Sequence, residues 1–301
     1  MSSRVRALLA AGLRAMLYPG LEAAWLQAFA VAGRLAPPRL ARAWDGAGGG
    51  TVLIVAPHPD DETAGCGGAA CLHGLAGDTV TALVLTDGRA SRAGDGGPSL
   101  LAVLRAGEAR AAARALGLAG LELAGLPEGE WALEEGTAVI RRALLAHRPA
   151  VVYAPSCVDY HPEHVRVASA CARALREIGA GAPRIRIYET LVPLGSRLVN
   201  LVADTSAVVE RKQAALDCYS SQRLGLVQVR RRDRYTARLF GCTRTAEAFC
   251  ELPAERYAAM SEAGRWSGRP PFRGLRGRPL TDPLAYLVGR RARLGLRRRL
   301  V

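Results

Sequence analysis

From residue 51 onward, short apolar runs alternate with longer segments in which apolar residues recur every three or four positions. Short runs rich in Val, Leu and Ile indicate buried strands, and the longer segments indicate helices. The predicted strands cover residues 52–56, 79–85, 120–124, 150–154 and 185–189, and the predicted helices cover 64–75, 99–117, 134–147, 163–179 and 207–220. Strands separated by helices of this length need crossover connections. The predicted fold class is therefore α/β, a Rossmann-like, mostly parallel sheet with helices on both faces.

Two of the predicted strands end in clusters of histidine and carboxylate residues. The strand at 52–56 leads into residues 57–62, Pro-His-Pro-Asp-Asp-Glu, and the apolar run 151–155 precedes residues 159–164, Asp-Tyr-His-Pro-Glu-His. Ligands of open α/β sheets bind outside the carboxyl ends of the strands, so we expect the two clusters to meet there. Because such groups are costly to bury unless they are paired or coordinate a cation, the sequence predicts a metal site at this edge.

The spacing of these residues suits a hydrolytic metal ion. A catalytic zinc needs about three protein ligands and one open position for water. His58 and Asp61 are three residues apart in a tight turn, so both can face one ion. His161 and His164 share one face of a predicted helix, so that one can bind the metal while the other donates a proton. Asp60, beside a ligand, is then free to take a proton from water.

Taken together, these motifs resemble those of the PIG-L/LmbE-type family of zinc-dependent N-deacetylases, and the resemblance extends over roughly residues 51–252. It also includes Arg105, Glu108, Lys212 and residues 86–88, 187–189, 221–222 and 246–249. The site that the resemblance implies has one Zn²⁺ per chain held by His58, Asp61 and His164, with Asp60 as general base and His161 as the charged or proton-donating partner. The implied reaction removes the acetyl group from an N-acetylated amino sugar or a GlcNAc-containing glycoconjugate.

Two positions depart from the family pattern. Glu163 stands where the second motif usually has Asp, so the orientation of His161 falls to Glu163 or to Asp159. Arg89 follows residues 86–88 at a position where family members often carry Glu, which favours a substrate bearing a phosphate or another anion. We therefore expect Arg89, Asp159 and Glu163 to contact the substrate.

Other candidate motifs are weaker. Residues 65–70 fit the G-x-G-x-x-A dinucleotide fingerprint, but the acidic residues 60–62 separate them from the strand and would repel phosphates. These glycines are instead expected to let a helix pack closely on the sheet, and no dinucleotide cofactor is predicted. Cys66 has no base spaced to activate it, and His73 and His147 have no acidic neighbours in sequence, which favours structural roles for all three.

The formal net charge of +14 is concentrated at the ends of the chain. Residues 51–264 carry 24 Lys/Arg and 24 Asp/Glu, whereas residues 1–50 carry 6 and 2, and residues 265–301 carry 11 and 1. The expected organisation is an apolar and basic N-terminal helical extension with a glycine linker (1–50), a deacetylase-like domain (51–264) and an Arg-rich tail (265–301). The tail suits an anionic membrane surface better than nucleic acid, for which no recognition motif is present.

The seven cysteines are scattered and form no Cys-x-x-Cys pair, which fits a reducing compartment. The expected location is cytoplasmic, with peripheral attachment at the inner face of the cytoplasmic membrane. Two alternatives remain open: an amidase acting on a sugar-linked conjugate, and a non-catalytic membrane- or nucleic-acid-binding protein with a degenerate site. The complete set of polar residues counts against the second alternative.

Overall fold

The computed structural model describes residues 41–44, 48–91, 97–157, 159, 161–179, 181–190, 194 and 198–261. The predicted N-terminal extension up to residue 40 and the predicted Arg-rich tail lie outside the described residues. The predicted limits of the central domain therefore stay a prediction.

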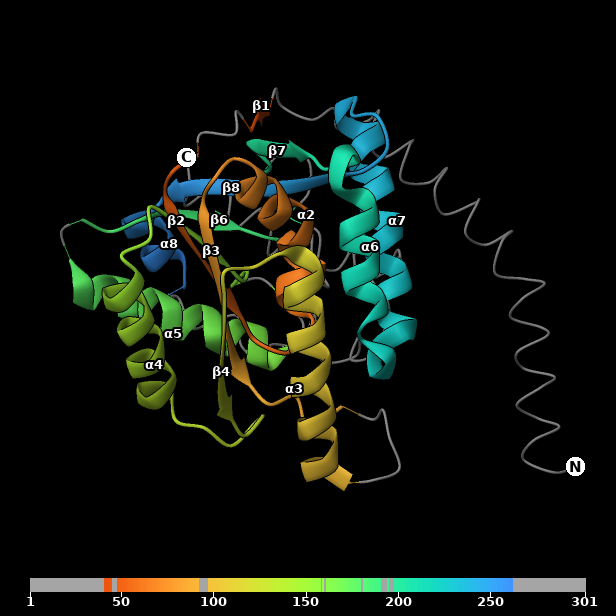
Figure 1. The fold of residues 1–301 in the computed structure, drawn as a ribbon. Helices are drawn as coiled ribbons and strands as arrows, with labels where there is room; N and C mark the ends of the chain where they lie inside the picture. Colours follow the sequence, from red (N-terminus) through yellow and green to blue (C-terminus); the bar gives the residue numbers. More distant parts are fainter. Residues whose placement is uncertain are drawn as a thin grey trace, which may run out of the picture.

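The described residues form one eight-stranded sheet with the strand order β1-β7-β8-β6-β5-β2-β3-β4 (Figure 1). Its strands are β1 (Arg42–Ala43), β2 (Thr51–Ala56), β3 (Thr79–Thr86), β4 (Gly120–Leu126), β5 (Val151–Ala154), β6 (Arg184–Ile187), β7 (Leu201–Asp204) and β8 (Ala246–Pro253). β8 runs antiparallel to both of its neighbours, β6 and β7, whereas the remaining pairs are parallel. The mostly parallel α/β sheet predicted from the sequence is confirmed.

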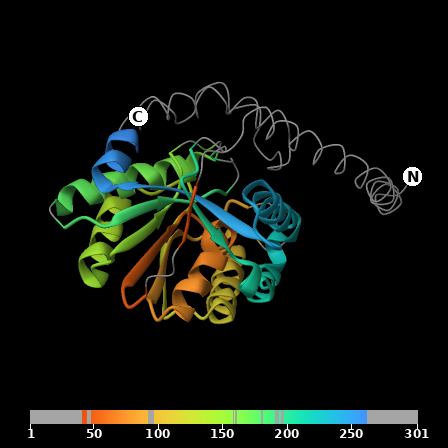
Figure 2. The same cartoon turned by 90° about the horizontal axis from the view of Figure 1, so that it is seen from above.

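Helices cover both faces of this sheet (Figure 2). They are α2 (Asp61–Leu75), α3 (Gly97–Leu116), α4 (Leu133–His147), α5 (Pro162–Ile178), α6 (Val209–Asp217), α7 (Arg223–Phe240) and α8 (Ala254–Ser261), with short 3₁₀ turns at Ser206–Val208 and Ser220–Gln222. α4, α5 and α8 pack on one face, and α2, α3 and α6 pack together on the other. β2 lies inside the sheet between β5 and β3, and its apolar run continues because helices cover it from both sides. Leu53 and Val55 join the core under α4 and α5, whereas Val52 and Ile54 join the core under α2.

All five predicted strands and four of the five predicted helices are present, with ends that differ by three residues or fewer. The fifth predicted helix, 207–220, is instead a 3₁₀ turn followed by the shorter α6. β7, β8, α7 and α8 were not expected from the apolar pattern.

The start of α2 packs directly against the strands at two glycines. A Cβ on Gly65 would lie 2.3 Å from Cδ2 of Tyr188, and one on Gly68 would lie 2.5 Å from Cγ2 of Thr205. The helix is kinked at Cys66, where φ is −150° and ψ is 23°. The glycines therefore allow close packing, as expected, and this contact fixes the helix that begins with the first acidic cluster.

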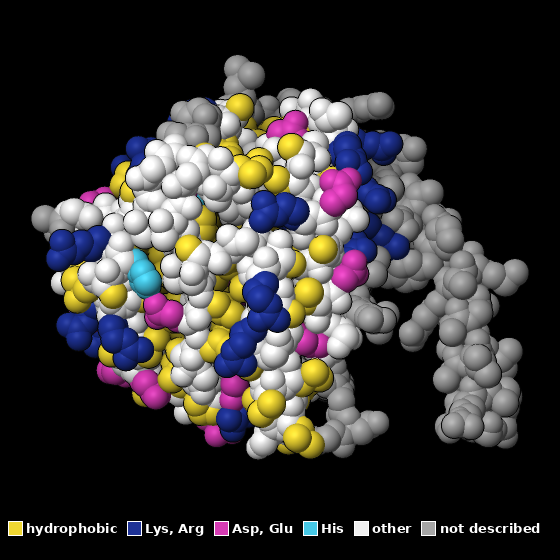
Figure 3. Space-filling view, viewed as in Figure 1, with side chains coloured by type: hydrophobic (Ala, Val, Ile, Leu, Met, Phe, Trp, Pro, Cys, Tyr) yellow, Lys and Arg dark blue, Asp and Glu magenta, His cyan; other side chains and the backbone are white. Residues whose placement is uncertain are grey.

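Basic side chains gather at the edge of the molecule formed by α6 and α7 (Figure 3). Several of them are paired: Arg230 lies 2.5 Å from Asp217, and Arg244 lies 2.7 Å from Glu210. Among the described residues, no helix is both long enough and apolar enough to cross a membrane.

Candidate metal centre

Both histidine-containing clusters reach one pocket at the carboxyl ends of the central strands. The loop after β2 supplies His58 and Asp60, the first turn of α2 supplies Asp61, and the start of α5 supplies His161 and His164. The pocket has a volume of about 230 Å³. Two segments about a hundred residues apart in the chain therefore meet, as the sheet topology predicts.

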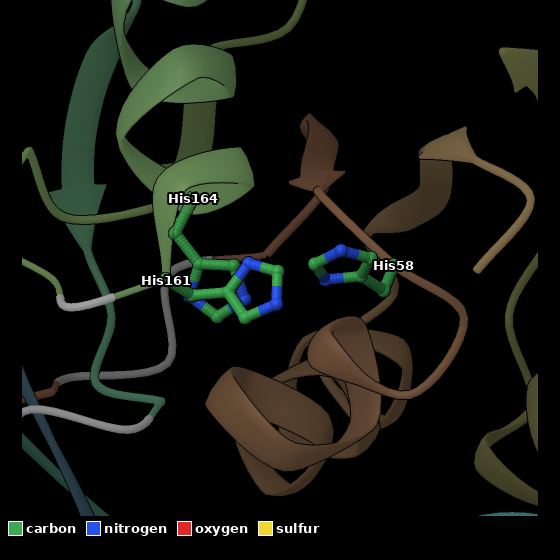
Figure 4. Close-up of side chains that lie close together, drawn as sticks. All are labelled: His58, His161 and His164. Atoms are coloured by element: carbon green, nitrogen blue, oxygen red, sulfur yellow. The ribbon is translucent and has the colours of Figure 1, made fainter. Parts of the chain in front are cut away.

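One carboxylate oxygen lies between two imidazoles. Oδ2 of Asp61 is 3.1 Å from Nδ1 of His58 and 3.2 Å from Nε2 of His164. Asp61 and His58 are each 6 % exposed and His164 is 2 % exposed, so the three polar groups are removed from water together. The rings of His58, His161 and His164 face one another from two sides of the pocket (Figure 4).

This donor set fits a divalent transition metal. The three imidazoles each offer a nitrogen within 4.8 Å of the others, and Asp61 adds an oxygen between two of them. Nδ1 of His161 is buried without a hydrogen-bond partner. Nitrogen and carboxylate oxygen are the donors that zinc accepts in catalytic sites, where three protein ligands are usual. The structure thus offers two overlapping sets, the three histidines and the predicted set of His58, Asp61 and His164.

Opposing effects set the protonation of the histidines. Burial lowers the pKa of His58, but its hydrogen bonds to Asp61 and Glu128 outweigh burial and raise the pKa to about 8. Burial, together with the neighbouring His58 and His164, lowers the pKa of His161 to about 3. This favours a neutral His161 ring, which still has one N–H to donate.

Asp60 lies beside His58, Asp61 and His164, and its backbone conformation is unusual. Its φ angle is 130°, outside the range that most residues with a Cβ adopt. Arg105 fixes the turn, because its guanidinium donates to the carbonyl oxygens of Pro59 at 2.6 Å and Gly88 at 3.1 Å and lies 3.1 Å from Oδ2 of Asp60. Burial raises the pKa of Asp60 to about 7 despite the opposing charge of Arg105.

A buried ion network holds the helix that carries these groups. Nζ of Lys212 lies 2.6 Å from Asp233 and 2.6 Å from Glu247. Glu247 also accepts from the backbone N–H groups of Gly68 and Ala69, which lie near the kink in α2. These residues therefore hold α2 in place, and α2 in turn positions Asp61 in the site.

The three residues predicted to contact the substrate lie in different surroundings. Asp159 is buried beneath the site, where its Oδ2 lies 3.0 Å from Nδ1 of His164 and its Oδ1 accepts from the backbone N–H of His161. Glu163 accepts from Nε1 of Trp131 at 2.6 Å and points into the core. Arg89 pairs with Asp87 at 2.5 Å, and neither Arg89 nor Glu163 is among the residues that line the pocket. Their predicted contact with substrate stays untested.

The other weighed residues have structural surroundings. Burial raises the pKa of the Cys66 thiol well above its ordinary value, which leaves it unreactive. His73 is 2 % exposed and lies 2.5 Å from Asp78, while His147 lies 2.5 Å from Glu122. Both rings are outside the pocket.

Sequence reasoning missed Glu128 and the apolar wall of the pocket. Glu128 lines the pocket two residues after β4, and its Oε1 lies 3.2 Å from Nε2 of His58. Leu226 and Val229 of α7 line the pocket as well. The position of Glu128 after a predicted parallel strand was a usable signal, because the same rule placed the two histidine clusters.

The fold and this site define a class: a doubly wound α/β domain with a histidine–carboxylate, metal-type site at the carboxyl ends of its strands. Residues 53–175 match the model of the PIG-L family, described as GlcNAc-PI de-N-acetylase. The resemblance drawn from the motifs is therefore confirmed.

Solved structures share the fold. The conserved protein TT1542 from Thermus thermophilus is 29 % identical with a TM-score of 0.59, and the match covers 67 % of this chain and 94 % of that one. The N,N'-diacetylchitobiose deacetylase from Pyrococcus horikoshii is 22 % identical with a TM-score of 0.60, and the match covers 69 % and 85 %. GalB, the 4-carboxy-2-hydroxymuconate hydratase from Pseudomonas putida, is 22 % identical with a TM-score of 0.59, and the match covers 68 % and 96 %.

Proposed function

We propose that this protein is a zinc-dependent hydrolase that removes the N-acetyl group from an N-acetylated amino sugar or a GlcNAc-containing glycoconjugate. One observation carries the proposal: in a domain that matches the model of the PIG-L family, His58, Asp61 and His164 converge in a buried pocket with Asp60 beside them. His58, Asp61 and His164 would hold the ion, because Asp61 already lies between the two rings.

The chemistry that a divalent cation supplies in such a site is polarisation of the amide carbonyl and acidification of water. Asp60 accepts a proton from water as the water oxygen adds to the amide carbon. His161 donates a ring N–H to the carbonyl oxygen as that oxygen becomes negatively charged. The carbon–nitrogen bond then breaks while Asp60 returns the proton to the departing amine, which leaves acetate and a free amino sugar.

The fold alone does not determine the reaction, because one solved structure with a similar fold is a hydratase. The family match favours amide hydrolysis, because its description is that of a de-N-acetylase. The N,N'-diacetylchitobiose deacetylase from Pyrococcus horikoshii is similar at the level of the fold and is consistent with this choice.

The test is acetate release from a panel of N-acetylated monosaccharides, chito-oligosaccharides, nucleotide sugars and lipid-linked GlcNAc. We expect release from at least one member, loss after chelator treatment and recovery with Zn²⁺. His58→Ala and His164→Ala should lose both metal and activity, whereas His147→Ala, changed outside the pocket, should keep both. Release that persists in fully metal-free protein would rule out the proposed role of zinc.

The same assay separates the alternatives. Release of a larger acid from a sugar-linked conjugate, with none from the acetylated sugars, would favour the amidase. Full zinc retention in both histidine variants would mean that the ion binds elsewhere.

A further inference from the structure

His58 makes polar contacts through both of its ring nitrogens. Nδ1 faces Oδ2 of Asp61 at 3.1 Å, on the side where His164 lies. Nε2 faces away from that carboxylate and lies 3.2 Å from Oε1 of Glu128. The ring is thus held between two carboxylates from different parts of the chain, one in α2 and one after β4.

Glu128 is itself fixed. Its side chain is 9 % exposed, and its second oxygen, Oε2, accepts from the backbone N–H of Ala90 at 3.1 Å. Its own backbone N–H donates to Oδ1 of Asp87 at 3.3 Å. Both Asp87 and Ala90 belong to the loop after β3, so Glu128 connects this loop, which lines the pocket, to the ring of His58.

The second histidine of the predicted ligand set has the same arrangement. Nε2 of His164 faces Asp61, and its other nitrogen, Nδ1, lies 3.0 Å from Oδ2 of Asp159. Both rings therefore turn one nitrogen toward Asp61 and the other toward a second carboxylate. In metal sites this pattern fixes the tautomer and the orientation of the ligand imidazole and makes it a stronger donor.

We propose that Glu128 is the positioning residue of the metal site: it accepts the Nε2–H of His58, holds the Nδ1 lone pair toward Asp61 and His164, and thereby strengthens zinc binding. The inference rests on the proposed zinc site. It assigns Glu128 a role that does not require contact with substrate, and it links the loop after β3 to the strength of metal binding.

A competing arrangement would use Glu128 as a ligand. Its Oε1 lies 3.8 Å from Nε2 of His161, so an ion on that side would meet Nε2 of His58, His161 and Glu128 instead of Asp61. The two arrangements differ in what His161 does. In ours, His161→Ala keeps zinc with nearly the affinity of the wild-type protein, whereas in the competing one it loses zinc as His58→Ala does.

The experiment measures the zinc dissociation constant of the full chain by competition with a chromophoric chelator, without any substrate. We expect Glu128→Gln and Glu128→Ala to bind Zn²⁺ about 10–100-fold more weakly than the wild-type protein. The matched control is Glu130→Gln, an exposed carboxylate two residues away, which should bind as the wild type does. The Co²⁺-loaded Glu128→Gln protein should keep the band intensity of the wild type but shift in band position, because the ligands stay the same while one imidazole changes its donor strength.

Circular dichroism and thermal unfolding of the metal-free proteins identify any variant that fails to fold, and the isosteric Glu128→Gln variant decides the question if Glu128→Ala is unstable. Unchanged zinc affinity in folded Glu128→Gln overturns the inference while leaving the proposed function intact. Loss of zinc in both Glu128→Ala and His161→Ala also overturns it, because Glu128 would then be a ligand. A wild-type protein without zinc affinity contradicts the proposed function itself.

Discussion

Asp60, the proposed general base, has an uncommon backbone conformation. A residue with a Cβ held at a φ of 130° costs about 1–3 kcal/mol and persists only where its surroundings enforce it. The enforcing contacts are those of Arg105 with Asp60 and with the carbonyl oxygen of Pro59. The strain turns the Asp60 carboxylate into the pocket while the next residue, Asp61, faces the histidines.

Asp60→Asn should lower kcat by at least about 10², because the amide cannot accept the proton from water. Zinc content should stay at the wild-type level, because Asp60 is not one of the proposed ligands. Steady-state kinetics and metal analysis of the same preparation check both points. Turnover equal to the wild type would reject the general base, and lost zinc would make Asp60 a ligand.

His73 allows a prediction about acid stability away from the metal site. Burial lowers the pKa of His73, opposed by its hydrogen bond to Asp78. A histidine whose folded-state pKa is depressed stays neutral while the unfolded chain takes up a proton, so stability is full above the unfolded pKa of about 6.5 and falls as the pH drops below it. His73→Gln should therefore show a smaller drop in melting temperature between about pH 7.5 and pH 5.5 than the wild type.

Differential scanning calorimetry at both pH values measures this difference. The other four histidines are present in both proteins, so their contributions cancel in the comparison. An equal drop in the two proteins would mean that His73 does not sense acid.

At the scale of single residues, the sequence predicted which side chains would come together better than it predicted their individual contacts. The two clusters predicted that His58, Asp61 and His164 would meet, because histidine and carboxylate residues follow apolar strands in both places. Glu128 was missed because it stands between Pro127 and Gly129 in a short segment that contains no histidine and therefore no metal-type pattern. The direction of Glu163 could not be predicted either, since it depends on Trp131, whose indole N–H lies 2.6 Å from it.

Among the helices, α2 is the element that most tightly connects packing to the site. It begins with Asp61, crosses the strands at two glycines and receives the carboxylate of Glu247 at its kink. Displacement of this helix would therefore move a proposed ligand.

Gly65→Ala should destabilise the protein by about 1–3 kcal/mol, because its Cβ would lie 2.3 Å from the ring of Tyr188. Gly107→Ala is the matched control, since Gly107 lies in α3 with no atom within 4 Å of an added Cβ. It should gain up to about 1 kcal/mol from the better helix propensity of alanine. Urea unfolding of both variants compares them, and equal effects would contradict the packing role of Gly65.

The apolar pattern of the sequence did not predict β8 and α7, which carry charged side chains. β8 contains Glu247 and Glu251, whose partners Lys212 and Arg186 are distant in sequence. A local apolar pattern cannot anticipate such pairs, because the cost of burying each charge is offset only in the folded state. α7 was missed for a similar reason, since its many arginines obscure its apolar face.

At the scale of the whole molecule, the charge of the chain comes chiefly from residues that the structure does not describe. Residues 265–301 carry 11 Lys/Arg against one acidic residue, whereas the central segment is balanced. We propose that this tail brings the enzyme to anionic membranes, where each arginine close to the surface contributes about 1 kcal/mol.

Co-sedimentation with liposomes tests this proposal. The full chain should bind vesicles that contain anionic lipid, bind less at high salt, and bind far less after deletion of residues 265–301. The deletion variant should still act on a small soluble substrate. Equal binding to neutral vesicles, or none to either kind, would dismiss the membrane proposal and the location it implies.

The place of β8 in the sheet also has a consequence for the order in which the chain can fold during synthesis. β8 lies between β6 and β7, and β1 joins the sheet only through β7. While residues 246–253 are still inside the ribosome, the nascent chain can assemble β2 to β6, but no strand yet connects β7 and β1 to the rest of the sheet. The N-terminal segment at Arg42–Ala43 therefore waits for nearly the whole domain to leave the ribosome before it docks, so its contacts are among the most non-local and the last to form.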